Sequence, residues 1–345
     1  MKVLFSNSHK LIIFTFIFLF SLYLISESSH PFLSCQNDQT LSIKDSIVPW
    51  RAPEVSSIPD NEDGKIIILG RNIFNKTNLY LGPDVSDEAN RYTNAGLACQ
   101  NCHLKGGTLK NVMGLVGVYY NYPKFDTRSG KNINIEERIN NCMKRSLNGK
   151  PLPDTSKEMT ALVSYMKWLS TYAPKGTKVE GQGLPKIELI NRAADKENGK
   201  NVYLNYCTTC HADNGQGVLR SPGNVDVLAD SLKGYEFPPV MGSNSFNDGA
   251  GMYRLLTATS FIYAKMPYND AILSLEDSYD VAAYIISTPR PKLPGIESDY
   301  PDLKFKPVDF PFPPYEDKFS AEEHKYGPYQ PMLKEGETSK FVKPL

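Results

Sequence analysis

The chain has 345 residues, of which 38 are basic and 38 are acidic, and 41% are hydrophobic. This length suggests about two domains, the composition excludes a wholly disordered chain, and the net charge of zero gives no reason to expect a nucleic-acid partner. Six cysteines are too few for a disulfide scaffold, and five histidines exclude any site that needs many imidazoles.

The first 44 residues are interpreted as a leader and a linker. Lys2 and Lys10 flank the start of an apolar run from Leu11 to Ile25, which is typical of a signal peptide. The run is short for a membrane-spanning helix, which needs about 20 residues. Cys35 follows it at a position that resembles a bacterial lipoprotein cleavage site. A lipidated Cys35, an ordinary cleaved signal and an uncleaved membrane anchor stay open, and all three predict an exported, periplasmic protein.

Two motifs of the form CxxCH follow, and they carry the strongest chemical signal in the chain. They are Cys99-Gln-Asn-Cys102-His103 and Cys207-Thr-Thr-Cys210-His211. In this attachment signal both thiols bind the vinyl groups of a c-type haem, and the histidine is placed to bind the iron. Zinc or redox CxxC sites would need further ligands, which so few histidines cannot supply. We therefore expect two covalent c-type haems, with His103 and His211 as iron ligands.

Between the motifs, the segment ERINNCMKRSLNG carries Cys142, the one cysteine outside both motifs and the leader region. A lone thiol in an oxidising compartment needs an explanation. It can be a thiolate ligand of the first iron, a bridge to Cys35, or an inert thiol beside Met143 as the ligand. The thiolate is the favoured interpretation, because it would depress the potential of its haem and suit chemistry at the iron.

The same region is locally basic. Between Leu104 and Lys150 the chain has nine basic and three acidic residues, which gives +6 in a protein of zero net charge. Such a patch would concentrate small anions near the first haem, and arginines bind oxyanions through paired N–H groups. A solvated face, or partners for haem propionates, is the alternative. The basic residues are Lys105, Lys110, Lys124, Arg128, Lys131, Arg138, Lys144, Arg145 and Lys150.

A helix is predicted from Ser156, and a linker rich in Gly, Pro and Lys is predicted from Tyr172 to Pro185. The helix has an apolar face at helical spacing. This face consists of Met159, Leu162, Val163, Met166 and Leu169.

The second motif lies in a compact unit. The segment from Gly199 to Gly217 predicts a short helix, the attachment site and a glycine turn. Lys265-Met266-Pro267 follows, and then a helix from Leu275 with apolar residues at helical spacing. A methionine before proline and a C-terminal helix resemble class I cytochrome c, in which that methionine is the distal ligand. Met266 is therefore expected to bind the second iron, with Met252 as an alternative and the amine of Lys265 as a competitor.

The first half repeats this plan loosely, with Tyr165 in the place of Tyr284. The predicted fold class is all-α: two class I cytochrome c-like domains in tandem, followed by an extended tail rich in proline and aromatic residues. The tail holds ten of the 25 prolines, so it is expected to wrap along the surface of the folded body. The predicted boundaries are 1–44 for the leader and linker, 45–178 and 179–290 for the two domains, and 291–345 for the tail.

Several segments together resemble the di-haem thiosulfate dehydrogenase family, also called bifunctional thiosulfate dehydrogenase/tetrathionate reductase. The most specific is the Arg-Ile-Asn-x-Cys-x-x-Arg-Ser run around Cys142. The matching segments are NAGLACQNCHLKGGT, YNYPKFDTRSG, ERINNCMKRSLNG, SFNDGAGMYR, FIYAKMP and DKFSAEEHKYGPYQPM.

The resemblance implies that two thiosulfates are joined to tetrathionate at the first haem, or the reverse. His103 and Cys142 would be the axial ligands of that haem, and His211 with Met266 or Lys265 those of the second. By the same matches, a substrate pocket would be lined by Arg128, Arg138 and Ser146. The implied electron partner is a cytochrome c or similar carrier. Two other interpretations stay open: a di-haem cytochrome that only relays electrons, and a related sulfur-oxidation subunit that acts on a carrier protein.

Overall fold

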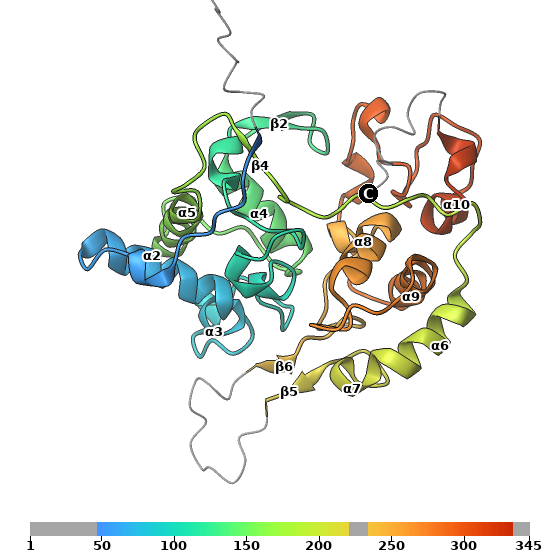
Figure 1. Ribbon diagram of the computed structural model, residues 1–345, viewed down its shortest axis with the longest axis horizontal. Helices are drawn as coiled ribbons and strands as arrows, with labels where there is room; N and C mark the ends of the chain where they lie inside the picture. The colour runs from blue at the N-terminus through green and yellow to red at the C-terminus, as the bar shows by residue number, and fades with distance from the viewer. Residues whose placement is uncertain (1–46, 221–233, 334–345) are drawn as a thin grey trace, which may run out of the picture. The chain divides into compact units, whose positions relative to one another are not determined.

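The computed structural model describes residues 47–220 and 234–333, and it is built mainly from helices (Figure 1). The α-helices are α2 (Glu62–Asn75), α3 (Thr77–Leu81), α4 (Ile135–Arg145), α5 (Lys157–Leu169), α6 (Lys196–Tyr206), α7 (Thr208–His211), α8 (Leu255–Lys265), α9 (Leu275–Ser287) and α10 (Ala321–Tyr326). The strands are β1 (Ile47–Val48), β2 (Lys124–Asp126), β3 (Lys131–Ile133), β4 (Lys178–Val179), β5 (Val218–Leu219) and β6 (Tyr235–Phe237). Short 3₁₀ turns connect them, including Cys99–Asn101, Ile296–Ser298 and Leu303–Phe305.

In the first half, helices α2 and α5 pack against each other at a glycine (Figure 1). A Cβ added at Gly70 would lie 1.9 Å from the carbonyl oxygen of Ala161, so only glycine permits this approach. One turn later, the rings of Phe74 and Tyr165 meet with centroids 5.5 Å apart. This crossing fixes the N-terminal helix of the domain against its C-terminal helix.

The second half repeats the crossing with α6 and α9. A Cβ at Gly199 would lie 2.0 Å from the carbonyl oxygen of Asp280, and the rings of Tyr203 and Tyr284 are 5.6 Å apart. Residues 70–74 read GRNIF and residues 199–203 read GKNVY. The glycine and the aromatic ring therefore occupy the same places in both halves, as expected for a duplicated domain.

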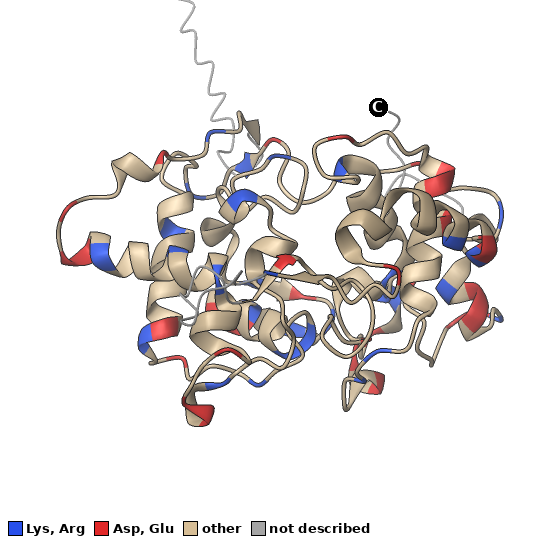
Figure 2. Cartoon of the chain, turned by 90° about the horizontal axis from the view of Figure 1, so that it is seen from below, with Lys and Arg blue, Asp and Glu red and all other residues tan. Residues whose placement is uncertain are grey.

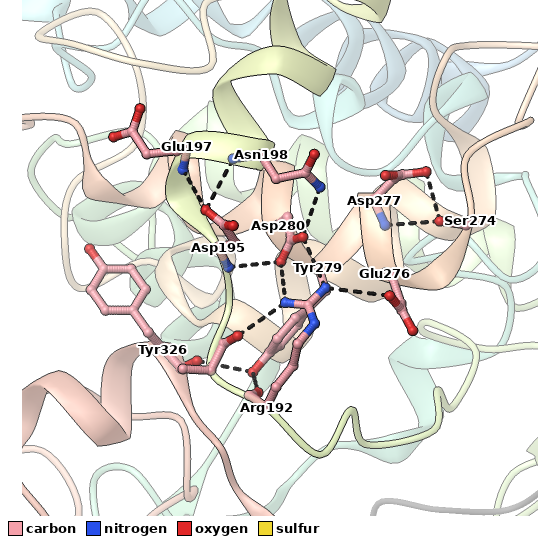
Figure 3. A network of polar contacts seen from close by, with 11 residues as sticks. Arg192, Asp195, Glu197, Asn198, Ser274, Glu276, Asp277, Tyr279, Asp280 and Tyr326 are labelled. Carbon is pink, nitrogen blue, oxygen red and sulfur yellow. Dashed lines mark hydrogen bonds and ion pairs between the residues drawn. The ribbon is translucent and has the colours of Figure 1, made fainter.

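A buried carboxylate stabilises the second crossing (Figure 3). The side chain of Asp280 is 2% exposed, and Arg192 binds it with two N–H···O contacts of 2.7 and 2.9 Å. The Asp195 backbone N–H and the Asn198 side-chain amide also donate to it, each at 2.9 Å. All of its acceptor sites are used, which is the condition for burying a charge.

The strands are short and peripheral. Strands β1 and β4 pair in parallel, whereas β2 with β3 and β5 with β6 form antiparallel pairs. The β2–β3 hairpin precedes α4, the helix that carries Cys142. The pairing of β1 with β4 brings the start of the described chain to the linker at Lys178–Val179.

Each half has its own hydrophobic core, and the tail packs onto them. Tyr326 and Tyr329 are buried in the second core. Asp309 is fully buried, pairs with Arg254 and accepts from the backbone N–H of Leu256 at 3.0 Å. The described part of the tail thus contacts the folded body closely, and it contains α10 and several 3₁₀ turns in addition to extended segments.

The tandem all-α architecture is confirmed, and α5, α6 and α9 lie where the sequence placed helices. No helix within residues 47–220 and 234–333 is long and apolar enough to cross a membrane. The apolar run at residues 11–25 and Cys35 lie outside the described residues.

Candidate active site

The first CxxCH motif is held in place by its neighbours in the fold. Cys99 begins a 3₁₀ turn, and its backbone N–H donates to the Thr77 hydroxyl at 3.1 Å. The His103 backbone N–H donates to the carbonyl of Cys99 at 3.0 Å. The Nδ1 of His103 lies 2.6 Å from the carbonyl oxygen of Met113. Because a carbonyl only accepts, Nδ1 carries the proton, and Nε2 is left as the nitrogen that can bind a metal.

The second motif is arranged in the same way. His211 ends α7, and its Nδ1 lies 2.8 Å from the carbonyl oxygen of Pro238. Burial lowers the pKa of His211, which favours the neutral imidazole. Both histidines therefore have one ring nitrogen hydrogen-bonded to backbone and the other available as a ligand.

The motif cysteines fit covalent haem attachment. All four are free thiols. Burial raises the pKa of Cys99 and of Cys102 to about 12, and that of Cys207 to about 11. Neutral thiols that are not joined to each other are the groups that add to haem vinyls, so the residues present fit the two haems.

Two arginines also fit the negative charge that haem propionates bring. Burial lowers the pKa of Arg290 to about 10, and its guanidinium donates only to the carbonyls of Phe246 and Ile285 at 3.2 and 2.8 Å. The Nε atoms of Arg290 and Arg145 are buried and have no hydrogen-bond partner in the described part of the chain. Carboxylates of a bound haem would be suitable acceptors for such donors.

Helix α4 places Cys142 at the centre of a charged site. The helix starts at a reciprocal cap, in which the Asn134 side chain accepts from the backbone N–H of Glu137 and Glu137 accepts from that of Asn134. One turn on, Arg138 Nη1 lies 3.0 Å from the sulfur of Cys142. Although burial raises the pKa of Cys142, the positive Arg138 guanidinium and the nearby His103 outweigh that effect and lower the pKa to about 6. The thiolate is therefore the favoured form at neutral pH.

The two ligands predicted for the first iron thus lie beside each other. The sulfur of Cys142 is hydrogen-bonded to Arg138, and His103 is close enough to lower the pKa of the thiol. Met143, the alternative to Cys142, is 1% exposed within the first core. A disulfide between Cys142 and Cys35 cannot be placed, since Cys35 lies outside the described residues.

Two further residues at this site lie in the β2–β3 region. Burial raises the pKa of Tyr122, although the positive charge of the nearby Arg138 opposes this shift. Lys124 Nζ lies 5.2 Å from the centroid of the Tyr122 ring, and burial and Arg138 lower the pKa of Lys124. The sequence placed Lys124 in the basic patch and indicated no role for Tyr122. Tyr122 could have been identified from the segment YNYPKFDTRSG, which matches the family and contains both residues.

Arg128 and Ser146 occupy different places from Arg138. Ser146 is the residue that ends α4, and its backbone N–H donates to the carbonyl of Cys142. Arg128 lies in the turn between β2 and β3 and contacts Gly249 and Tyr300. No hydrogen bond or ion pair joins Arg128 to Cys142 within the described chain.

Basic and acidic residues are interspersed over the described chain (Figure 2), and acids from elsewhere in the chain neutralise part of the local positive excess. Lys110 pairs with Glu180 at 2.8 Å and Arg145 pairs with Asp299 at 2.6 Å. Both acids lie outside residues 104–150, so they reduce the count from +6 to +4. A positive excess therefore remains within residues 104–150.

The candidate ligands of the second iron lie at the end of α8. Lys265 is the last residue of the helix, and its Nζ lies 5.5 Å from the centroid of the Tyr268 ring. Met266 is half-buried against the second core, and Met252 packs against both cores. The assignment of Met266 as the ligand stays a prediction.

Comparison with known proteins identifies the two halves. Residues 89–174 match the family model for the SoxA/TsdA cytochrome c domain, and residues 196–289 match that for cytochrome c. Two such domains, each with its own CxxCH motif, imply two c-type haems.

Similar proteins cover most of the chain. A thiosulfate dehydrogenase from Psychrobacter arcticus is 36% identical over 253 residues, which are 73% of this chain and 72% of that protein. One from Allochromatium vinosum is 37% identical over 249 residues, 71% of this chain and 85% of that protein. The solved thiosulfate dehydrogenase (TsdBA) from Marichromatium purpuratum matches 72% of this chain with a TM-score of 0.63 and 29% identity. The match spans half the length of that solved chain.

Proposed function

We propose that this chain, which belongs to the thiosulfate dehydrogenase family, joins two thiosulfates to tetrathionate with release of two electrons, or catalyses the reverse reduction. The observation that carries this proposal is Cys142, a thiolate-favouring cysteine with Arg138 3.0 Å away and His103 beside it. A simple electron relay does not require an ionised sulfur nucleophile in a basic pocket.

The residues that would hold the two haems follow from the motifs. Cys99, Cys102, His103 and Cys142 would hold the first. Cys207, Cys210 and His211 would bind the second, with Met266 or Lys265 as the distal ligand. When bound, each haem can take up one of the two electrons that the sulfur chemistry releases.

The proposed first step forms a sulfur–sulfur bond on the protein. The Cys142 thiolate joins the outer sulfur of one thiosulfate through a new Sγ–S bond, which gives an adduct in which Sγ carries –S–SO₃⁻ and releases two electrons. In the second step, the outer sulfur of another thiosulfate attacks the sulfur of the adduct that lies between Sγ and the sulfonate group. This displaces the Cys142 thiolate and releases tetrathionate, as in thiol–disulfide exchange. No proton is gained or lost in either step, and the thiolate is regenerated.

Positive charge is needed because two dianions must approach one thiolate. Arg138 lies against Cys142 and would stabilise the developing charge. Arg128 and Ser146 are proposed as further contacts for the sulfonate groups, since arginine binds oxyanions through two N–H groups. The remaining local charge of +4, counted above, would hold both anions near the site.

The proposal extends to the place and partner of the reaction. Cytochrome c domains are typically exported, and the leader predicts the periplasm, with lipidated Cys35 or the apolar run as a membrane attachment. The electrons would leave through the second haem to a cytochrome c or a similar carrier. Tetrathionate would be the product in one direction and the substrate in the other.

The experiment is a steady-state assay in both directions with a redox dye, on the haem-loaded protein and its Cys142→Ala variant. We expect the variant to lose turnover while its absorption spectrum still shows two haems. Glu136→Gln, on the same helix, is the matched control and should keep wild-type turnover. Near-normal activity of Cys142→Ala would refute the proposed mechanism. A wild-type protein whose haems neither thiosulfate nor tetrathionate can reduce or oxidise would favour the electron relay.

A further inference from the structure

Two arginines of the first half meet at one carboxylate of the tail. Arg145 binds Asp299 through two contacts, Nη1 to Oδ2 at 2.7 Å and Nη2 to Oδ1 at 2.6 Å. Arg128 Nε lies 3.7 Å from Oδ2 of the same carboxylate. The side chains of Arg145 and Asp299 are only 12% and 7% exposed. This is a buried, bidentate pair with a second guanidinium at its edge, and such pairs fix geometry.

The next residue of the tail holds Arg128 at its backbone and its side chain. The Tyr300 backbone N–H donates to the carbonyl of Arg128 at 2.8 Å. Arg128 Nε donates to the Tyr300 hydroxyl at 3.4 Å, and the guanidinium carbon lies 5.7 Å from the centroid of that ring. Pro301 then packs against Gly130, where an added Cβ would lie 2.7 Å from the proline ring. The tail therefore fixes the turn between β2 and β3.

The second half of the chain contributes one more hydrogen-bond acceptor. The carbonyl oxygen of Gly249 accepts from Arg128 Nη1 at 3.3 Å and from Arg145 Nη1 at 3.2 Å. Arg128 is thus held from two distant parts of the chain: the loop at Gly249 and the tail. A long side chain held at so many points has lost the rotamer freedom that binding an anion would otherwise cost.

The net charge and the unused hydrogen-bond donors of this group favour binding of an anion. Two guanidiniums share one carboxylate, so the group of Arg128, Arg145 and Asp299 keeps one net positive charge. A guanidinium has five N–H donors, and the contacts given above use only some of those of Arg128. Arg128 thus combines a fixed orientation with unused donors.

We propose that Asp299 is a positioning residue of the active site: anchored by Arg145, it orients Arg128 to bind the sulfonate group of a thiosulfate. The inference rests on the function proposed above. It assigns part of the substrate site to the tail, more than 150 residues away from α4 in the sequence.

The test is the kinetics of haem-loaded Asp299→Asn with thiosulfate. We expect KM to rise about tenfold, with kcat changed less than twofold, because the variant weakens anion binding and leaves Cys142 in place. Glu297→Gln is the matched control: it removes a carboxylate two residues away that is exposed, and its KM should equal that of the wild type.

A double-mutant cycle separates positioning from a general loss of structure. In an Arg128→Gln background, Asp299→Asn should raise KM less than twofold further, because the residue through which it acts is gone. Additive effects of the two substitutions, or an unchanged KM in Asp299→Asn, would overturn the inference. A wild-type protein without activity would overturn the proposed function and this inference with it.

Tyr300→Phe provides a milder variant if Asp299→Asn does not fold. It removes only the hydroxyl that accepts from Arg128 and leaves the ion pair intact. We expect a KM about threefold above that of the wild type, and this difference should vanish in the Arg128→Gln background. An unchanged KM in Tyr300→Phe, with Asp299→Asn unfolded, would count against positioning by the tail.

Discussion

The helix crossing at Gly199 gives a quantitative prediction about stability. An alanine Cβ there would lie 2.0 Å from the carbonyl oxygen of Asp280, and real Cβ contacts are essentially never shorter than 3.0 Å. Helices α6 and α9 must therefore separate locally by about 1 Å, the difference between these distances. A gap of that size forfeits a quarter to a half of each van der Waals contact it opens.

The net cost follows from two opposing effects. Overpacking of a well-packed interface costs about 3 kcal/mol, whereas replacing a helical glycine with alanine returns about 1 kcal/mol of helix propensity. We therefore expect Gly199→Ala to destabilise the protein by about 2 kcal/mol and to lower its Tm by about 4–8 °C. Gly70→Ala should behave alike, because its Cβ would lie 1.9 Å from the Ala161 carbonyl.

The assay is thermal unfolding of the haem-loaded variants, followed by far-UV circular dichroism. Gly251→Ala is the control, since an added Cβ at Gly251 has no heavy atom within 4 Å. Its Tm should stay within 1–2 °C of the wild type, as is usual for an uncrowded position. A Tm for Gly199→Ala that equals or exceeds that of Gly251→Ala would refute the close-packing argument.

The other predictions concern three polar groups. Asp280→Asn removes the buried carboxylate that pairs with Arg192, whose side chain is 37% exposed, and should cost about 1–3 kcal/mol, measured by chemical denaturation. A stability equal to that of the wild type would contradict the network in Figure 3. Tyr165→Phe removes the hydroxyl that donates to the Gly106 carbonyl at 2.7 Å and should cost about 1–3 kcal/mol in the same measurement. An unchanged free energy of unfolding would contradict a stabilising role of this hydrogen bond. Hydrogen bonds from Lys131 and from the Asn134 backbone lower the pKa of Glu137, so its contribution to stability is present above its ordinary pKa of 4.5 and disappears as the pH falls through the lower folded value. The difference in Tm between Glu137→Gln and the wild type should therefore shrink on acidification, and a difference that grows would have the wrong sign.

Local patterns were sufficient to predict the chemistry of the motifs. The CxxCH sequences, the lone Cys142 and the apolar faces of α5 and α9 are each contained in a short stretch of chain, so they could be recognised without the fold. Helix α2 was not predicted, although GRNIF at residues 70–74 matches GKNVY at 199–203. Phe74 precedes Cys99 by 25 positions, whereas Tyr203 precedes Cys207 by four. The additional residues in the first half make the correspondence of the two helices difficult to recognise in the sequence.

Contacts between distant segments could not be predicted in this way. Arg128 and Arg145 were expected to be basic residues available to anions, yet Asp299 neutralises part of their charge. Nothing in the sequence around Asp299 indicates this role, because an acidic residue in a proline-rich tail is usually solvated. Only the folded chain brings the tail to the β2–β3 turn.

The position of Asp299 after both CxxCH motifs has a consequence for the order of assembly. Synthesis proceeds from the N-terminus, so both CxxCH motifs and Cys142 are complete before the tail exists. Haem attachment can therefore precede docking of the tail, and a partly made chain would carry its cofactors while Arg128 is still unconstrained. Only docking of the tail onto the first half would then bring the anion site to its final geometry, so full activity would wait for that contact.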